Sequence, residues 1–157
     1  MAIEIERKFL VAALPPPDEL GVGVHLRQGY LAEEGDVEVR VRIAATEATL
    51  TVKAGTGLAR TEVDVSIPAA QAEDLWAHTV GRRIDKTRYR VALAGPAGPV
   101  AEVDVYGGSL AGMCVVEVEF ASAAEGAAFD PPGWFGRELT GERGWSNAAL
   151  ARVGRPG

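Results

Sequence analysis

Charged side chains recur at alternate positions near the start of this chain. In the stretch EIERKF, Glu4, Glu6 and Lys8 alternate with positions that include Ile5 and Phe9. Side chains two residues apart share one face of a strand, whereas they scatter around the axis of a helix. Carboxylates bind hard divalent cations, and lysine and arginine bind phosphate. A strand face of this kind could therefore hold a metal ion and a polyanion together.

Six further segments show the same alternation, and basic residues dominate some of them while acidic residues dominate others. Like charges about 7 Å apart on one strand face repel by roughly 2 kcal/mol at an effective dielectric near 20. This cost is small in water. Inside a closed barrel it is large, unless a polyanion and divalent cations enter. The ionisable positions are Glu38, Arg40, Arg42, Lys53, Arg60, Glu62, Asp64, Lys86, Arg88, Arg90, Glu102, Asp104, Glu117 and Glu119.

These patterns predict a mainly β fold with a few short helices. Glycine and proline clusters separate most of the strands. A longer surface loop is expected over 15–23, and a rigid loop that would close one end of a barrel is expected over 131–136. Strands are predicted at 2–11, 24–32, 37–44, 48–54, 59–67, 84–93, 100–106 and 113–120, and helices at 68–79, 122–129 and 146–153.

Alternation alone leaves two architectures open. In an antiparallel sandwich, the charged faces would meet water and the apolar faces would form the core. In a closed barrel, which eight antiparallel strands suffice to form, the charged faces would instead line a ligand-filled interior. The apolar outer faces of such a barrel would need cover from the helices or from a partner chain.

Composition narrows the classes of function. The 157 residues suit a single domain, and a net charge of -6 argues against nucleic-acid binding. No apolar run approaches the length that crosses a membrane. Cys114 is the only cysteine, which excludes an internal disulfide and fits a reducing compartment. We therefore expect a cytoplasmic protein with no nucleic-acid or membrane partner.

The ordered set of charged segments resembles the CYTH-domain proteins, the triphosphate tunnel metalloenzymes. The resemblance covers about residues 1–150 and is closest to the short bacterial members similar to inorganic tripolyphosphatases. A Glu-x-Glu-x-Lys triplet alone would be weak evidence for the family. The triplet followed by the later charged segments in this order is specific evidence for it. The matching segments are EIERKFLV, LRQGYL, VRVR, TVK, RTEVDV, GRRIDKTRY, EVDVY and VEVEF.

The resemblance implies an eight-stranded antiparallel closed barrel over 1–150, with short helices packed outside it and a flexible tail at 151–157. The implied activity is metal-dependent hydrolysis of the terminal phosphate of inorganic tripolyphosphate or a related small-molecule triphosphate. Mg²⁺ or Mn²⁺ is the implied cofactor, and a homodimer is possible.

The resemblance also assigns roles to residues. A tunnel carboxylate (Glu6, Glu62 or Asp64) would orient the attacking water, and Lys8 and Lys86 would stabilise charge on the leaving pyrophosphate. One departure is GERGWSN at 141–147, where relatives often carry a basic residue and tyrosine in place of Gly144 and Trp145; Arg143 is the candidate substitute. The implied metal ligands are Glu4, Glu6, Glu117 and Glu119, with Glu102 and Asp104 as direct or water-mediated ligands. The implied phosphate ligands are Lys8, Arg40, Arg42, Lys53, Lys86, Arg88 and Arg143.

Three alternative functions share the same charged interior. A class IV adenylyl cyclase and a thiamine triphosphatase would differ in what binds the organic end of the substrate. A polyphosphate- or nucleotide-binding module without catalysis would need mainly the basic residues, so the carboxylates disfavour it. Phosphoryl transfer itself relies on positioning and charge neutralisation, which this set of residues can supply.

Overall fold

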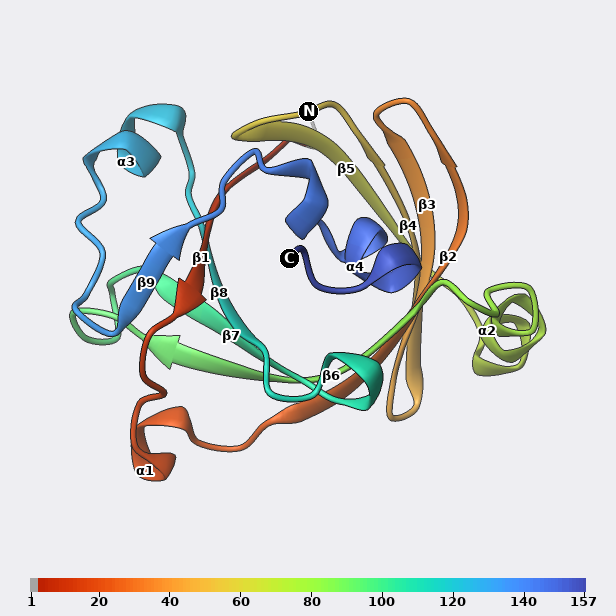
Figure 1. Ribbon diagram of the computed structural model, residues 1–157, viewed down its shortest axis with the longest axis horizontal. Coiled ribbons are helices and arrows are strands. Elements are labelled where there is room, and N and C mark those ends of the chain that lie inside the picture. Colours follow the sequence, from red (N-terminus) through yellow and green to blue (C-terminus); the bar gives the residue numbers. More distant parts are fainter. Residues whose placement is uncertain (1–2) are drawn as a thin grey trace.

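Antiparallel strands make up most of the computed structural model, which describes residues 3–157 (Figure 1). Eight of the strands lie within two residues of their predicted bounds. Residue 2, which the first predicted strand includes, lies outside the described residues. The strands are β1 (Ile3–Val11), β2 (Val24–Glu34), β3 (Val37–Ala44), β4 (Glu47–Ala54), β5 (Ala59–Ser66), β6 (Arg83–Ala92), β7 (Val100–Tyr106), β8 (Cys114–Glu119) and β9 (Phe135–Glu138).

The sheet closes on itself. Its strands follow the order β5-β4-β3-β2-β6-β7-β8-β1-β9, and a further pairing joins β5 to β1. β1 divides its free edge between two partners: Ile3 to Ile5 pair with β5, whereas Phe9 and Val11 pair with β9. The expectation of a closed eight-stranded antiparallel barrel is therefore confirmed, with β9 as an additional strand.

β9 and the first helix occupy segments that the sequence predicts to be loops. β9 begins at Phe135, inside the expected loop over 131–136. A four-residue strand contains too few alternations to be recognised from periodicity. It forms because β1 extends past its contact with β5, so that backbone groups on its edge are available for pairing. The one-turn helix α1 (Pro17–Leu20) lies in the same way inside the loop expected over 15–23.

Short helices occupy several connections between strands and the segment that follows β9. Ser122 and Ser146 cap two of them, because each hydroxyl accepts a hydrogen bond of 3.1 Å from a backbone N–H three residues later. The predicted domain boundary at residue 150 falls inside the last helix, and the mobility of residues 151–157 stays a prediction. The remaining helices are α2 (Ala69–Trp76), α3 (Ala123–Ala128) and α4 (Asn147–Val153), with 3-10 turns η1 (Gly108–Leu110) and η2 (Arg143–Trp145).

Two of the three predicted helices, α2 and α3, help to cover apolar outer faces of the barrel, as the sequence predicts. α2 packs over β3 and β4, where Ala72 meets Val41 and Ile43. On the opposite wall, Phe9 of β1 and Val116 of β8 belong to a second outer cluster, which the segments around α1 and α3 help to cover. Burial of these aliphatic and aromatic side chains stabilises the barrel from outside.

The third predicted helix contradicts the expectation that all helices pack outside. α4 lies within the ring of strands (Figure 1). Its Leu150 joins a buried cluster with Tyr30, Ile84 and Tyr106, which belong to the inward rows of β2, β6 and β7. These inward rows turn apolar at the end of the barrel where β7 finishes and β6 begins. An apolar helix face is therefore buried there instead of outside, and α4 with η2 fills that end.

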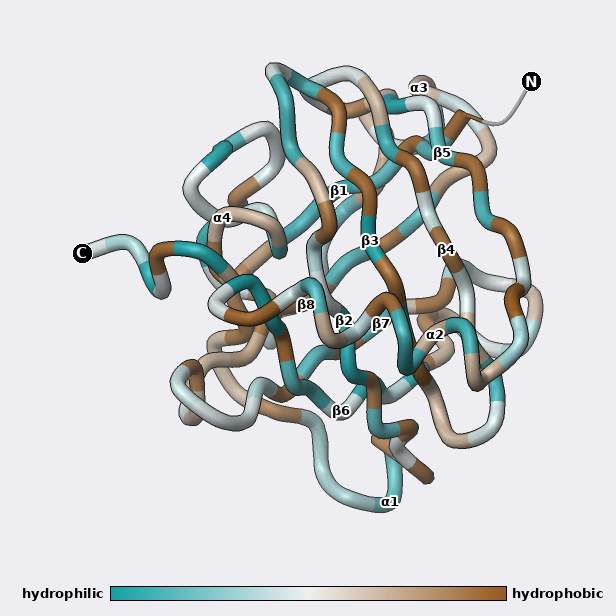
Figure 2. The backbone as a smooth tube through the Cα atoms, turned by 90° about the vertical axis from the view of Figure 1, so that its right-hand side faces the viewer, coloured by the Kyte–Doolittle hydropathy of each residue, from teal (hydrophilic) through white to brown (hydrophobic). Residues whose placement is uncertain are grey.

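Part of the outer surface stays exposed. The alternation of hydrophilic and hydrophobic residues is visible along β3 and β4 in Figure 2. Val52, Val63 and Val65 on β4 and β5 are 39%, 46% and 52% exposed, respectively, because α2 does not extend over them. Within residues 3–157, no helix has the length and apolar character needed to span a membrane.

Candidate active site

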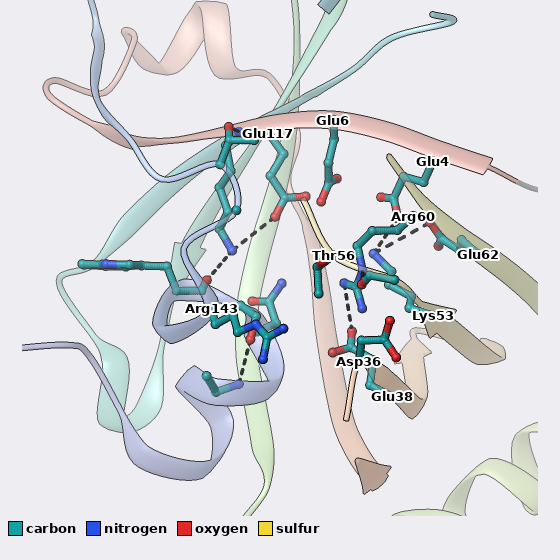
Figure 3. A pocket seen from close by; sticks show the side chains of 18 of the residues that line it. Glu4, Glu6, Asp36, Glu38, Lys53, Thr56, Arg60, Glu62, Glu117 and Arg143 are labelled. Atoms are coloured by element: carbon teal, nitrogen blue, oxygen red, sulfur yellow. Dashed lines mark hydrogen bonds and ion pairs between the residues drawn. The ribbon is translucent and has the colours of Figure 1, made fainter. Parts of the chain in front are cut away.

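The inward-facing charged rows line a single polar cavity of about 490 Å³ (Figure 3). This arrangement selects the barrel with a charged interior over the sandwich with a solvated charged face. Closure of the barrel turns the alternate positions of every wall strand toward one volume. The predicted residues that line the cavity are Glu4, Glu6, Lys8, Arg40, Arg42, Lys53, Glu62, Arg88, Glu102, Glu117, Glu119 and Arg143.

Carboxylates gather on the wall formed by β1, β7 and β8. Glu6 of β1 pairs in register with Glu119 of β8, and Glu117 of β8 pairs with Glu102 of β7. Like charges directly opposite each other on adjacent strands destabilise a sheet. Burial, together with the charges of Glu117 and Glu4, raises the pKa of Glu6 well above its ordinary value. This wall is therefore suited to binding cations.

Glu117 is the carboxylate of this wall with the strongest basic neighbours. Burial alone would raise its pKa, but the positive charges of Lys8, Arg88 and Lys86 more than offset burial and lower it. Lys8 Nζ lies 3.6 Å from Glu117 Oε1 and donates a 2.6 Å hydrogen bond to the carbonyl oxygen of Trp145. Glu117 is therefore ionised at neutral pH and ready to bind a cation.

Basic side chains gather on the opposite wall. Arg42 of β3 donates two hydrogen bonds, of 3.1 and 3.2 Å, to Gln28 Oε1. Burial and repulsion from Arg40 and Arg88 lower the pKa of Arg42 to about 10. Arg40 is 4% exposed, and its Nε is one of two buried side-chain polar atoms in residues 3–157 without a hydrogen-bond partner. An anion in the cavity would offset the positive charge of these guanidinium groups and relieve their repulsion.

A mixed cluster at β4 and β5 connects the two walls. Lys53 Nζ lies 2.9 Å from Glu4 Oε2 and 3.8 Å from Glu62 Oε2. Burial and a hydrogen bond with Glu4 raise the pKa of Glu62 to about 8. Burial opposes ionisation of Glu4, but the hydrogen bond with Glu62 and the charge of Lys53 lower its pKa below the ordinary value. The Glu62 carboxyl therefore holds its proton more tightly than an ordinary glutamate does, whereas the Glu4 carboxyl loses its proton more readily.

Three predicted site residues do not line the cavity. Lys86 and Asp104 are fully buried beneath Arg88, and their charged groups lie 2.6 Å apart. Burial lowers the pKa of Lys86 to about 7. Asp64 is an exposed residue near the end of β5, where it accepts a hydrogen bond from the Thr51 hydroxyl.

The cavity also includes residues that sequence reasoning did not assign to it. Tyr30 lies on the inward row of β2, in the segment LRQGYL that the family resemblance includes. Glu38 and Arg60 belong to the alternating charged rows, and they form a 3.7 Å ion pair at the cavity. Loop residues Asp36 and Thr56, labelled in Figure 3, come from turns that periodicity does not describe.

The acidic wall fits a divalent metal ion by its chemistry. Its donors are carboxylate oxygens, which Mg²⁺, Mn²⁺ and Ca²⁺ prefer. Within residues 3–157 these groups stand in cross-strand pairs, and no three acidic, histidine or cysteine side chains form a preassembled metal cluster. Such pairs suit an ion that keeps part of its shell for water and phosphate oxygens, as Mg²⁺ does.

Comparison with known proteins supports this reading of the cavity. The family model of the CYTH domain matches residues 2–130. An inorganic triphosphatase of Nitrosomonas europaea is 48% identical over 149 residues, which are 94% of this chain and 96% of that protein. An inorganic triphosphatase of Acetivibrio thermocellus is 35% identical over 154 residues, with 97% and 95% covered.

Solved structures show the same architecture. The crystal structure of the inorganic triphosphatase NE1496 superimposes with a TM-score of 0.70 at 42% identity, covering 97% of this chain and 99% of that chain. A Hippeastrum protein superimposes with a TM-score of 0.59 over 99% of this chain and 97% of that chain. At 14% identity, this second likeness shows the fold alone.

Proposed function

The chain belongs to the CYTH domain family, and on this premise we propose that it hydrolyses inorganic triphosphate with the help of a divalent metal ion. Near-complete coverage of relatives named inorganic triphosphatase supports the activity and a small-molecule triphosphate as substrate. The structural observation that carries the proposal is the separation of charge in the cavity, where carboxylates on one wall face guanidinium and ammonium groups on the other.

The carboxylate wall is the proposed metal site, and the metal is Mg²⁺ or Mn²⁺. A bound divalent cation supplies positive charge that polarises phosphate oxygens. The carboxylates hold this charge close to the substrate, and in doing so they lose the mutual repulsion of their cross-strand pairs. The cavity-lining carboxylates proposed to hold metal are Glu4, Glu6, Glu102, Glu117 and Glu119.

The basic wall is the proposed binding site for the phosphate chain. Arginine binds phosphate through paired N–H groups, whereas lysine acts as a point charge. The buried Nε of Arg40 has no hydrogen-bond partner among residues 3–157, and Arg40 lines the cavity, so its guanidinium group is a candidate for binding the anion. Arg42, Lys53 and Arg143 also face the cavity and add positive charge there, and Lys8 approaches from the acidic wall. Charge that develops on the leaving pyrophosphate would be stabilised by these groups.

Two cavity carboxylates are the proposed residues that orient the attacking water. Glu6 and Glu62 both line the cavity, and both have a raised pKa. A carboxylate whose pKa is raised is a stronger base than an ordinary glutamate, and it accepts a proton from water more readily once it is ionised. Asp64, the third candidate by sequence, is outside the cavity lining and hydrogen-bonded to Thr51. We assign the role to Glu6 or Glu62.

The experiment that tests the proposal measures phosphate release from tripolyphosphate, ATP and thiamine triphosphate, each with Mg²⁺, with Mn²⁺ and after removal of metal by a chelator. Arg40→Met is the matched variant, because it removes a phosphate ligand and leaves every carboxylate in place. The expected result is metal-dependent release of phosphate from tripolyphosphate, well above that from the organic triphosphates, and a strong loss in the variant.

Other outcomes would redirect the assignment. Formation of a cyclic nucleotide and pyrophosphate from ATP would identify a cyclase. A preference for thiamine triphosphate would identify a thiamine triphosphatase. Tight tripolyphosphate binding without turnover, whether metal is present or absent, would identify a binding module.

A homodimer is the proposed assembly, supported by the exposed valines on β4 and β5. Sedimentation analysis of the wild type and of a Val63→Lys variant tests it: the variant should shift toward monomer. The cytoplasmic location and the absence of nucleic-acid and membrane partners stay predictions from composition.

A further inference from the structure

Beneath the cavity lies a buried ion pair for which the proposed reaction has no direct use. Asp104 of β7 and Lys86 of β6 are both fully buried, with Lys86 Nζ at 2.6 Å from Asp104 Oδ2. Neither side chain lines the cavity. Taking two charges out of water is costly, so a buried ion pair is weak evidence for a stabilising role. Its function is better sought in the third residue that it contacts.

That third residue is Arg88, which does line the cavity. Arg88 Nε donates to Asp104 Oδ1 at 2.7 Å, and Arg88 Nη2 donates to Asp104 Oδ2 at 2.8 Å. Two parallel hydrogen bonds of this kind fix the plane and direction of a guanidinium group. Arg88 is therefore held from behind by a carboxylate that no solvent reaches.

The remaining donors of Arg88 face other groups. A guanidinium has five N–H donors. Asp104 takes two of them, and Glu102 accepts a third from Nη1 at 3.2 Å. One N–H on Nη1 and one on Nη2 make no hydrogen bond within residues 3–157 and can donate to a ligand in the cavity, where Nη2 also lies 3.8 Å from Glu117 Oε2. This pair of terminal nitrogens is the fork that binds phosphate oxygens.

The charges in this cluster also need Asp104. Lys86, Arg88 and Arg42 are close enough to repel one another. Asp104 offsets one positive charge within this group, so Arg88 can stay in place beside Lys86. Both oxygens of Asp104 accept hydrogen bonds from these two basic side chains.

We propose that Asp104 and Lys86 are positioning residues that orient Arg88 toward the phosphate chain, and that neither of them touches metal or substrate. The identity of the substrate in this assignment rests on the triphosphatase function proposed above. The assignment differs from the roles that the family resemblance implies, in which Asp104 binds metal and Lys86 binds phosphate.

A double-mutant cycle tests whether Asp104 acts through Arg88. The variants are Asp104→Asn, Arg88→Ala and the two combined. Asp85→Asn serves as the matched control, because Asp85 is an exposed aspartate on the same sheet that pairs with His25. In Asp104→Asn the Arg88 guanidinium is no longer held by a carboxylate. A displacement of about 1 Å should lower kcat/KM for tripolyphosphate by up to about 100-fold. In the Arg88→Ala background the same change should add little, and a full additional loss would overturn the proposal.

Metal affinity separates positioning from metal ligation. Calorimetric titration with Mn²⁺ alone, without substrate, should give the same affinity for Asp104→Asn as for wild type. Glu119→Gln, which alters the proposed metal wall, should bind Mn²⁺ more weakly. If Asp104→Asn lost Mn²⁺ affinity as Glu119→Gln does, Asp104 would be a metal ligand and the proposal would be wrong.

A readout independent of activity uses the Arg88 Nε–H group. This group is hydrogen-bonded to a buried carboxylate, so its proton should exchange slowly with water and give a signal in a 15N-resolved NMR spectrum. The signal is assigned to Arg88 because it should be absent from the spectrum of Arg88→Lys. The Lys86→Met/Asp104→Leu variant removes both fully buried charges together, so Lys86 is not left without its partner, and Arg88 keeps its hydrogen bond to Glu102. The signal should vanish in this variant and persist in Asp85→Asn. Persistence of the Arg88 signal in the double variant would refute the positioning role. This test does not depend on hydrolysis: if wild type failed to hydrolyse tripolyphosphate while the signal behaved as expected, only the proposed function would be wrong.

Discussion

Glu6 of β1 and Glu119 of β8 are direct cross-strand partners, so two carboxylates occupy one patch of the inner wall. Burial raises the pKa of each of them, and neighbouring carboxylates raise it further. The protein without metal thus keeps negative charge where it is unfavourable. This strain is the expected source of its metal dependence.

Metal binding should therefore stabilise the fold. Saturating Mg²⁺ or Mn²⁺ is expected to raise the melting temperature, because a ligand at 100 times its Kd adds about 2.7 kcal/mol of stability. Glu119→Gln should melt at a higher temperature than wild type without metal, and it should gain less when metal is added. Differential scanning fluorimetry with and without chelator measures both effects. An equal metal-induced shift in the two proteins would argue against Glu119 as a metal ligand.

Arg42 should contribute to substrate binding and contribute little to the stability of the fold. Repulsion from Arg40 and Arg88 lowers its pKa to about 10, so its charge is unfavourable in the empty cavity. Arg42→Met removes this repulsion but also removes the donors to buried Gln28 Oε1, so the free energy of unfolding should change little, while the KM for tripolyphosphate rises. Urea unfolding and steady-state kinetics measure the two quantities separately. A destabilised variant with an unchanged KM would place Arg42 in the framework instead of the phosphate site.

Glu62 should make the metal-free protein less stable as pH rises. Its pKa is raised from 4.5 to about 8 in the folded state, so the fold binds this proton more tightly than the unfolded chain does. The resulting stability is complete below pH 4.5 and is lost as pH rises to about 8. Between pH 5 and 7 the slope should be shallower in Glu62→Gln, whose amide keeps a donor toward Glu4 at every pH. Parallel slopes from urea unfolding at several pH values would show that Glu62 does not carry the effect.

Leu150 should anchor the end of the barrel that α4 fills. It is 2% exposed and packs in the inner apolar cluster with Tyr30 and Ile84. Leu150→Ala is expected to cost about 2–5 kcal/mol of stability through lost burial and the cavity left behind. Val153→Ala on the same helix is the control: Val153 is 68% exposed, so the change should cost about 0.5 kcal/mol or less. Similar losses in the two variants, measured by urea unfolding, would contradict an inner anchor.

The sequence predicted the strands well because their signal is local. Alternation of Glu4, Glu6 and Lys8 with apolar neighbours places them on one strand face whatever surrounds the strand. β9 escaped this reasoning because Phe135–Glu138 is too short to show a period. α4 was recognised as a helix but placed on the wrong side, because its apolar face fits an outer wall and the inner apolar end equally well.

The candidate site, like the fold, was predicted only in part. Sequence identified which residue types could bind phosphate and metal, and most of them face the cavity. It could not show that Lys86 and Asp104 lie below the cavity, because they continue the same alternating rows as Arg88 and Glu102. Their burial depends on the position of each row along the barrel and on what fills its end.

By itself, the sequence determined two faces for each strand, one ionisable and one apolar, together with the family signature that their order carries. Only the tertiary structure decided which face points inward, because that depends on the pairing of β1 with β5, which lie more than fifty residues apart in the chain. Closure also decided the partners of each charge. A pattern of side chains specifies a surface, whereas electrostatic interactions depend on distances that long-range pairing alone creates.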